Sequence, residues 1–209
     1  MEEVLDVYQE TFDDERPLIC MDEASRQVLE DVTPPLPMKP GAPKRIDDKY
    51  ERHEVRSLLM FYNPIAGWRR VGCRESRTRL DWAHEVRQLL EVDYPQTQRV
   101  TLVCDNLNTH TKGAFYEVFE PQRARALVRR IEFRHTPKHG SWLNIAENEL
   151  SSLTRQCVTG RRFADIPTLQ SETAAWSLDV NSTQRGVDWQ MKLDDARCKL
   201  KSVYPKIKK

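Results

Sequence analysis

Two short apolar runs in this sequence each end in an aspartate. Leu18–Met21 is followed by Asp22, and Val100–Cys104 is followed by Asp105. Continuous apolar runs of this length are typical of strands that are buried on both faces of a sheet. Each aspartate then lies where its strand ends, in a setting suited to holding a metal ion. The feature predicts a helix-covered sheet with an acidic site at its edge.

The other elements complete an α/β pattern. Proline-rich residues 31–48 cannot form a helix or a central strand, so we expect an extended loop over the surface. The order of elements predicts an α/β fold with a mixed five-stranded sheet, helices on both faces and a short helical C-terminal extension. Beside the two runs above, we predict strands at 57–62, 69–73 and 131–135, and helices at 1–10, 78–92, 112–119, 122–130, 165–178 and 193–204.

The length of 209 residues suits one catalytic domain with short extensions. We expect a helical leader at 1–16, a catalytic domain at 17–160 and a packed C-terminal extension at 161–209. No apolar run approaches a membrane span, and the acidic start lacks the features of a secretory signal, so a cytoplasmic location is expected. Five cysteines without a CxxC pair predict reduced, mostly buried thiols.

The charge is unevenly distributed along the chain. Residues 1–15 carry acids without Lys or Arg, whereas the rest of the chain is basic although the net charge is only +1. Clusters of arginine and lysine suit contact with phosphate. Arg69 and Arg70 are candidates for such contact. The alternative for each cluster is an ordinary solvated surface.

A third carboxylate lies on a helix predicted to begin near Trp142. Glu147 and Glu149 fall on opposite edges of its apolar stripe, because two residues differ by about 200° on a helix. Only one of them can face the site, and the polar neighbours of Glu147 favour it slightly. Trp142 itself is expected to anchor the helix in the core rather than stack on a base.

Carboxylates gathered within a few ångströms stay charged together only when cations neutralise them. Oxygen ligands of this kind select Mg²⁺ or Mn²⁺, which leave room for substrate phosphate. Taken singly, Asp22 and Asp105 could each simply cap a turn. The three together indicate phosphoryl transfer on nucleic acid.

Three separated strings carry a resemblance to a known family. Cys20-Met21-Asp22-Glu23, Cys104-Asp105-Asn106-Leu-Asn-Thr-His110 and the tract from Thr136 to Leu150 occur in this order. Together they resemble the catalytic region of bacterial insertion-sequence transposases of the DDE superfamily, the group related to mariner elements. The resemblance extends from about residue 2 to residue 205.

The resemblance implies an RNase H-like fold in which Asp22, Asp105 and Glu147 hold two divalent ions, Mg²⁺ or Mn²⁺. It implies nicking of element ends by activated water, followed by attack of the freed 3′-hydroxyl on target DNA at TA. The expected partner is DNA, bound by a homodimer. Complete family members carry an N-terminal DNA-recognition region, and the leader at 1–16 is expected to form the join to such a region. The alternatives are a catalytically idle remnant that binds DNA or dimerises, and a nuclease that cuts without joining.

Five further residues are candidate DNA contacts near the carboxylates. Asn106 and His110 could orient the second aspartate or approach the scissile phosphate, or instead shape the turn and cap the next helix. Lys138, His139 and Ser141 lie in the loop before the third carboxylate, where they could grip phosphate. The alternative is a loop held by its own hydrogen bonds.

Overall fold

A mixed five-stranded sheet with strand order β3-β2-β1-β4-β5 forms the centre of the molecule. The computed structural model describes residues 1–11, 13–137, 140–183 and 185–199. β1 pairs antiparallel with β2 and parallel with β4, and β5 adds in parallel beyond β4. The strands are β1 (Leu18–Asp31), β2 (Tyr50–Asn63), β3 (Trp68–Arg74), β4 (Val100–Cys104) and β5 (Ile131–His135). The predicted fold class is confirmed.

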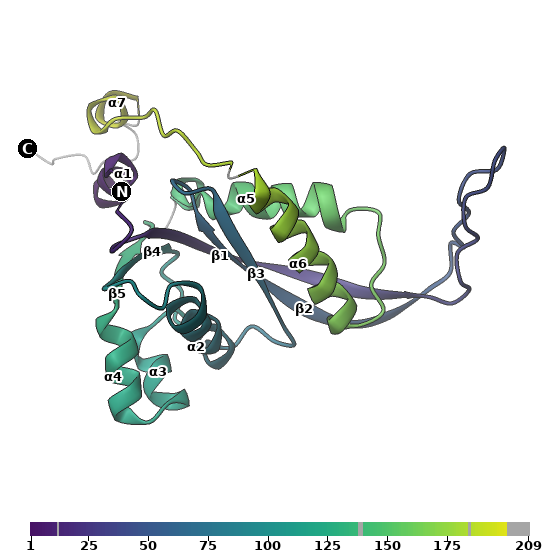
Figure 1. Cartoon of the computed structure of the whole chain (residues 1–209), viewed down its shortest axis with the longest axis horizontal. Helices are drawn as coiled ribbons and strands as arrows, with labels where there is room; N and C mark the ends of the chain where they lie inside the picture. The colour runs from purple at the N-terminus through teal and green to yellow at the C-terminus, as the bar shows by residue number, and fades with distance from the viewer. Residues whose placement is uncertain (12, 138–139, 184, 200–209) are drawn as a thin grey trace, which may run out of the picture.

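Helices cover both faces of this sheet (Figure 1). Side chains of β1 alternate between two cores, with Leu18 and Cys20 in one and Ile19 and Met21 in the other. One core includes α1 (Glu2–Gln9), α5 (Ala146–Leu153), α6 (Ile166–Ser182) and α7 (Leu193–Lys199). The other includes α2 (Arg79–Gln88), α3 (Lys112–Val118) and α4 (Pro121–Arg129).

The leader and the C-terminal helices share a core with the catalytic segment. Val4, Leu5 and Tyr8 of α1 are buried in the same cluster as α5 and the sheet, and so is Ala196 of α7. The helix predicted to extend to Tyr204 is described only to Lys199, and the remainder lies outside the described residues. In the described part of the chain, no helix is long and apolar enough to span a membrane.

The strands beside the proline-rich segment are longer than predicted. Residues 32–49 form a loop as expected, but β1 runs on to Asp31 and β2 already starts at Tyr50, whereas the second strand was predicted to start at Ser57. The two strands and the segment between them form an arm that projects from the body (Figure 1). Mostly polar residues build these strand extensions, with Val28 buried among them, and backbone pairing between the strands holds them together.

Arg162 fixes the base of this arm. Its guanidinium lies 2.6 Å from a carboxylate oxygen of Asp31 and donates to the backbone oxygens of Asp47 and Lys49. The same group lies over the ring of Tyr50. One arginine therefore joins both strands of the arm to the segment that precedes α6.

The start of the α5 region also differs from the prediction. Residues Ser141–Leu143 form a single 3₁₀ turn, and the α-helix begins only at Ala146. Trp142 is 42% exposed, whereas its neighbour Leu143 is fully buried. The expected anchoring role of Trp142 is therefore wrong, because the tighter turn directs Leu143 inward instead.

Candidate active site

Strand pairing brings the two aspartates close together where β4 ends. Asp105 follows its strand as predicted, but Asp22 lies within β1, because pairing with β2 continues that strand to Asp31. Cys20 of β1 lies opposite Val103 of β4 in a parallel ladder. Asp22 and Asp105 each follow their partner in that pair by two residues. Parallel neighbours are about 4.8 Å apart. The register therefore places the two aspartates side by side, although 82 residues separate them in the sequence.

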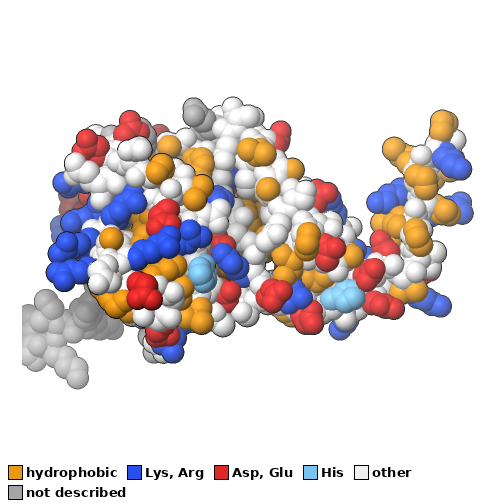
Figure 2. All heavy atoms as spheres, turned by 60° about the horizontal axis from the view of Figure 1, so that its bottom comes forward, with side chains coloured by type: hydrophobic (Ala, Val, Ile, Leu, Met, Phe, Trp, Pro, Cys, Tyr) orange, Lys and Arg blue, Asp and Glu red, His pale blue; other side chains and the backbone are white. Residues whose placement is uncertain are grey.

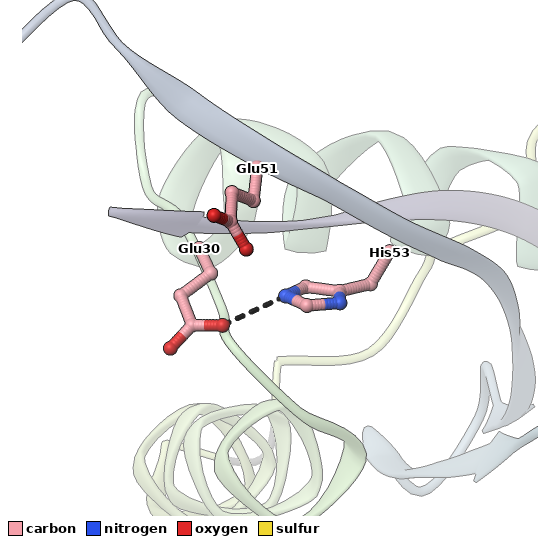
Figure 3. Close-up of side chains that lie close together, drawn as sticks. All are labelled: Glu30, Glu51 and His53. Carbon is pink, nitrogen blue, oxygen red and sulfur yellow. Dashed lines mark hydrogen bonds and ion pairs between the residues drawn. The ribbon is translucent and has the colours of Figure 1, made fainter. Parts of the chain in front are cut away.

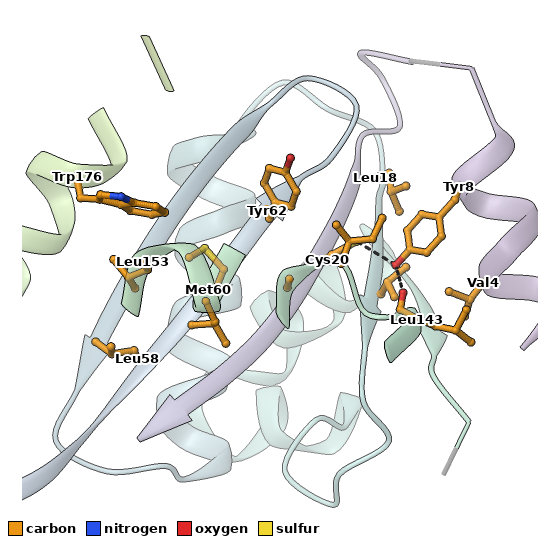
Figure 4. Close-up of a cluster of buried hydrophobic side chains, with 14 of the residues drawn as sticks. Val4, Tyr8, Leu18, Cys20, Leu58, Met60, Tyr62, Leu143, Leu153 and Trp176 are labelled. Atoms are coloured by element: carbon orange, nitrogen blue, oxygen red, sulfur yellow. Dashed lines mark hydrogen bonds between the residues drawn. The ribbon is translucent and has the colours of Figure 1, made fainter. Parts of the chain in front are cut away.

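Two buried hydrogen bonds fix the segment that leads into Glu147. The Asn144 side-chain amide donates to the backbone oxygen of Met21 at 2.8 Å, next to Asp22. The Tyr8 hydroxyl donates to the backbone oxygen of Leu143 at 2.6 Å (Figure 4). The sequence pattern singled out neither Asn144 nor Tyr8. Their roles depend on long-range contacts that no local pattern reveals.

The three carboxylates act on one another electrostatically. Burial raises the pKa of Asp22 from 3.8 to about 6. A hydrogen bond from the backbone N–H of Glu23 opposes the rise, and the negative charges of Glu147, Asp105 and Glu23 add to it. A cation that binds among such partly buried carboxylates relieves the repulsion between their negative charges. The donor set therefore fits a hard divalent cation.

Glu149 pairs with Arg69 and not with the other carboxylates of this site. Its carboxylate is buried and lies 3.0 Å from Nε of Arg69, whose side chain is fully buried. Glu147 remains half-buried on the other side of the helix. The structure thus separates the two glutamates as the helical period requires, and it is Glu147 whose charge reaches Asp22.

In the described part of the chain, the donor atoms of Asp22, Asp105 and Glu147 do not all lie within 4.8 Å of one another. Among the described residues, Glu30, Glu51 and His53 are the group of potential metal ligands whose donor atoms all lie within 4.8 Å of one another (Figure 3). Ligands of two ions that are roughly 3.5–4 Å apart can be spaced more widely than ligands of one. The exposed Glu30–Glu51–His53 group lies on the arm, where His53 and Glu30 form an ordinary 2.8 Å ion pair.

Comparison with known families decides the classification. The family model for the DDE superfamily endonuclease matches residues 17–170. This chain belongs to the DDE superfamily endonucleases. Membership implies dependence on divalent metal, and the matched range includes all three carboxylates.

Solved structures support the fold assignment of this DDE endonuclease. A Mos1 transposase paired-end complex with the left transposon end aligns with TM-score 0.56 and 13% identity, over 88% of this chain and 56% of that one. A Mos1 strand transfer complex aligns with TM-score 0.50 and 12% identity, over 90% and 60%. The chain thus spans less than two thirds of the Mos1 chains. A comparison with curated proteins gave no match.

A pocket adjoins the second aspartate of the DDE endonuclease. Its volume is about 440 Å³, and its lining includes Asp105, Asn106, Thr136 and Ser141. Asn106 and Ser141 are exposed, so both can meet a ligand in this pocket. Lys138 and His139 lie outside the described residues.

His110 is buried and faces carboxylates. Its Nδ1 lies 2.6 Å from Oδ1 of Asp105, and its Nε2 lies 3.1 Å from Oε1 of Glu23. Burial alone would lower the pKa of His110, but bonds to Asp105, Cys104 and Glu23 outweigh it and raise the pKa to about 11. The side chain is 2% exposed, which argues against direct contact with DNA. Of the three expected roles, the placement favours orienting the aspartate, because the N-cap of α3 is Thr111 and not His110.

Arg69 and Arg70 also face inward. Arg69 pairs with Glu149 and donates to the backbone oxygen of Arg185 at 2.8 Å. Arg70 binds Glu85 and lies 2.6 Å from Asp93. Guanidinium groups that are occupied by buried carboxylates are not available to phosphate. The placement of both arginines argues against the DNA contact that their sequence suggested.

The raised pKa of Asp22 predicts that Asp22→Asn stabilises the metal-free protein. Between pH 4 and 6 the Asp22 carboxyl binds its proton more tightly in the folded state than in the unfolded state. The free energy of unfolding therefore falls as pH rises through that window. Above pH 6 the variant should gain on the order of 1–3 kcal/mol in the free energy of unfolding. The gain should disappear below pH 4.

Urea unfolding in EDTA across pH 3.5–8 measures this effect. Asp179→Asn on the exposed side of α6 is the matched control and should change little. Mn²⁺ should stabilise the wild type more than Asp22→Asn. A variant that is no more stable than the wild type at pH 7 would contradict the raised pKa that burial and the neighbouring negative charges give Asp22.

Proposed function

We propose that this chain is the catalytic part of a transposase, which cleaves DNA at the ends of an insertion sequence and joins them to target DNA. The observation that carries the proposal is the convergence of Asp22, Asp105 and Glu147 from two strands and a helix in a DDE endonuclease. One of the two similar Mos1 structures is a complex with a transposon end, and the other is a strand transfer complex. We further propose a TA target, a homodimer on DNA and action at the DNA in the cytoplasm.

The three carboxylates would hold two divalent ions, Mg²⁺ or Mn²⁺. Such ions, when bound, activate an attacking oxygen and stabilise the leaving one. Asp22 presents its carboxylate from within β1 and Asp105 from just after β4, and the parallel ladder between the preceding residues keeps the two strands in register. Glu147 completes the set from a helix that Asn144 ties to β1. Two neighbouring interior strands thus supply the accuracy that in-line displacement at phosphorus requires.

Asn106 and Ser141 are the described residues best placed to meet DNA phosphate, because both are exposed in the pocket beside Asp105. We keep Lys138 and His139 as candidate contacts on the basis of their positions in the same loop. Basic side chains also lie on the projecting arm, where Figure 2 shows them interspersed with hydrophobic ones. They include Lys39, Lys44, Arg45 and Lys49, all of them exposed.

A plasmid assay tests cleavage and joining together. Supercoiled plasmid and a labelled duplex with a free 3′-hydroxyl are incubated with the protein and Mn²⁺. We expect nicked plasmid and covalent transfer of the label to it, both abolished by EDTA. Nicking without transfer would indicate a nuclease of the same fold. Failure to bind Mn²⁺ in calorimetric titration, together with no cleavage, would identify a catalytically idle remnant.

A further inference from the structure

We propose that Glu23 and His110 form a positioning pair that fixes the carboxylate of Asp105, so that one of its oxygens is held toward the protein and the other is left for metal. This inference rests on the proposed function, because it assigns Asp105 as a ligand. His110 is a positioning residue in this scheme. It acts on DNA only through the aspartate.

Both ring nitrogens of His110 are engaged by carboxylates from different parts of the chain. Nδ1 meets Asp105 at 2.6 Å and Nε2 meets Glu23 at 3.1 Å. Nδ1 also lies 3.4 Å from the backbone oxygen of Asp105. A ring that is held at both nitrogens has one orientation. His110 therefore links Glu23 of β1 to Asp105, the residue that follows β4, and fixes the position of one relative to the other.

Packing locks the same arrangement. The His110 ring stacks on Trp82 with centroids 5.4 Å apart and planes inclined by 28°. Trp82 is fully buried, and the Glu23 side chain is 5% exposed. Arg77 lies 3.5 Å from the second carboxylate oxygen of Glu23. Neither end of the pair can turn away without displacing buried groups.

Asp105 needs such support because of its place in the chain. It is the first residue after β4, and Asn106–Asn108 beyond it are exposed. Its side chain is 35% exposed, so packing alone does not fix its rotamer. Partners that orient metal ligands commonly contribute 10- to 100-fold in metal affinity or activity. Restraint of one oxygen by His110 would supply this contribution.

Strand geometry explains why Glu23 serves here rather than as a metal ligand. Successive side chains of a strand point to opposite faces of the sheet. Asp22 therefore faces the α5 side, which carries Glu147, while Glu23 faces the α2 side, which carries Trp82. Asp22 thus supplies a proposed metal ligand on one face of the sheet. On the other face, its neighbour Glu23 holds His110, which positions the second proposed ligand, Asp105.

Calorimetric titration of Mn²⁺ with wild type, His110→Ala, His110→Gln and Glu23→Gln tests the proposal. We expect His110→Ala to weaken Mn²⁺ binding about 10- to 100-fold, and the two conservative variants to retain part of the affinity. His84→Ala and Glu117→Ala, which lie on helices away from the site, are the matched controls and should bind as the wild type does.

The plasmid nicking assay then separates positioning from a direct role. Raising the Mn²⁺ concentration should restore nicking by His110→Gln but not by Asp105→Ala, while affinity for DNA in EDTA stays unchanged. Wild-type or tighter Mn²⁺ binding by folded His110→Ala and Glu23→Gln would overturn the proposal, as would a loss confined to DNA affinity. If the wild type itself bound no Mn²⁺, the proposed function would fail, which is a distinct result.

Discussion

Substitution of Asp22, Asp105 or Glu147 by Ala is expected to abolish Mn²⁺-dependent cleavage, with a loss on the order of 10³-fold or more in nicking rate. Each carboxylate supplies charge that no neighbour can replace. Asn144 is uncharged, Glu23 is engaged by His110, and Glu149 is engaged by Arg69. The loss should appear in the rate at saturating DNA, because the proposed role is in the chemical step.

The same variants should remain folded. None of the three carboxylates lies among the fully buried core residues, and removing one of several like charges relieves repulsion in the absence of metal. Thermal unfolding in EDTA and nicking in Mn²⁺ should therefore change independently. Glu117→Ala, which removes an acid from an exposed ion pair, provides the control. A Glu147→Gln variant with wild-type nicking would refute the assignment of the third carboxylate.

Substitution of Arg69 by Met is expected to cost about 3–5 kcal/mol in the free energy of unfolding. The change leaves Glu149 buried with its charge unpaired and also removes a bond to the backbone of Arg185. The guanidinium further lies 4.9 Å from the ring centroid of Tyr62. The Arg69–Glu149 pair thus joins β3 to α5, the helix that carries Glu147.

A double variant distinguishes this charge effect from lost packing. Arg69→Met combined with Glu149→Leu should recover most of the stability, because replacing both members of a buried pair by apolar groups is often neutral. Arg79→Ala, which breaks an exposed pair with Glu117, should cost less than about 1 kcal/mol. Denaturant unfolding measures all three. A single Arg69 variant as stable as the Arg79 control would show that the pair contributes little.

Elements defined by local patterns were predicted closely. β5 has the predicted bounds, and α2 begins after Thr78, whose hydroxyl accepts a hydrogen bond from the backbone of Asp81. The apolar stripe of the α5 region, which includes Leu150 and Leu153, is buried as its spacing required. These features depend on side chains within a few residues of one another, so the sequence shows them directly.

Elements stabilised by distant partners were predicted less well. The outer halves of β1 and β2 are mostly polar and were not recognised as strands, because their pairing with each other defines them. Trp142 was expected to be buried, but a 3₁₀ turn buries Leu143 instead. The arginines at 69 and 70 were candidate DNA contacts until folding brought carboxylates against them.

The sequence by itself determined the alternation of strands and helices, the chemistry of the candidate ligands and the resemblance that pointed to the DDE superfamily, because these depend on residue type and local spacing. Only the tertiary structure decided which charged groups meet. Glu23 and His110 are 87 residues apart, and Arg69 and Glu149 are 80 apart. Such pairs form when strands align and helices pack, and local periodicity carries no information about which distant side chain will be opposite.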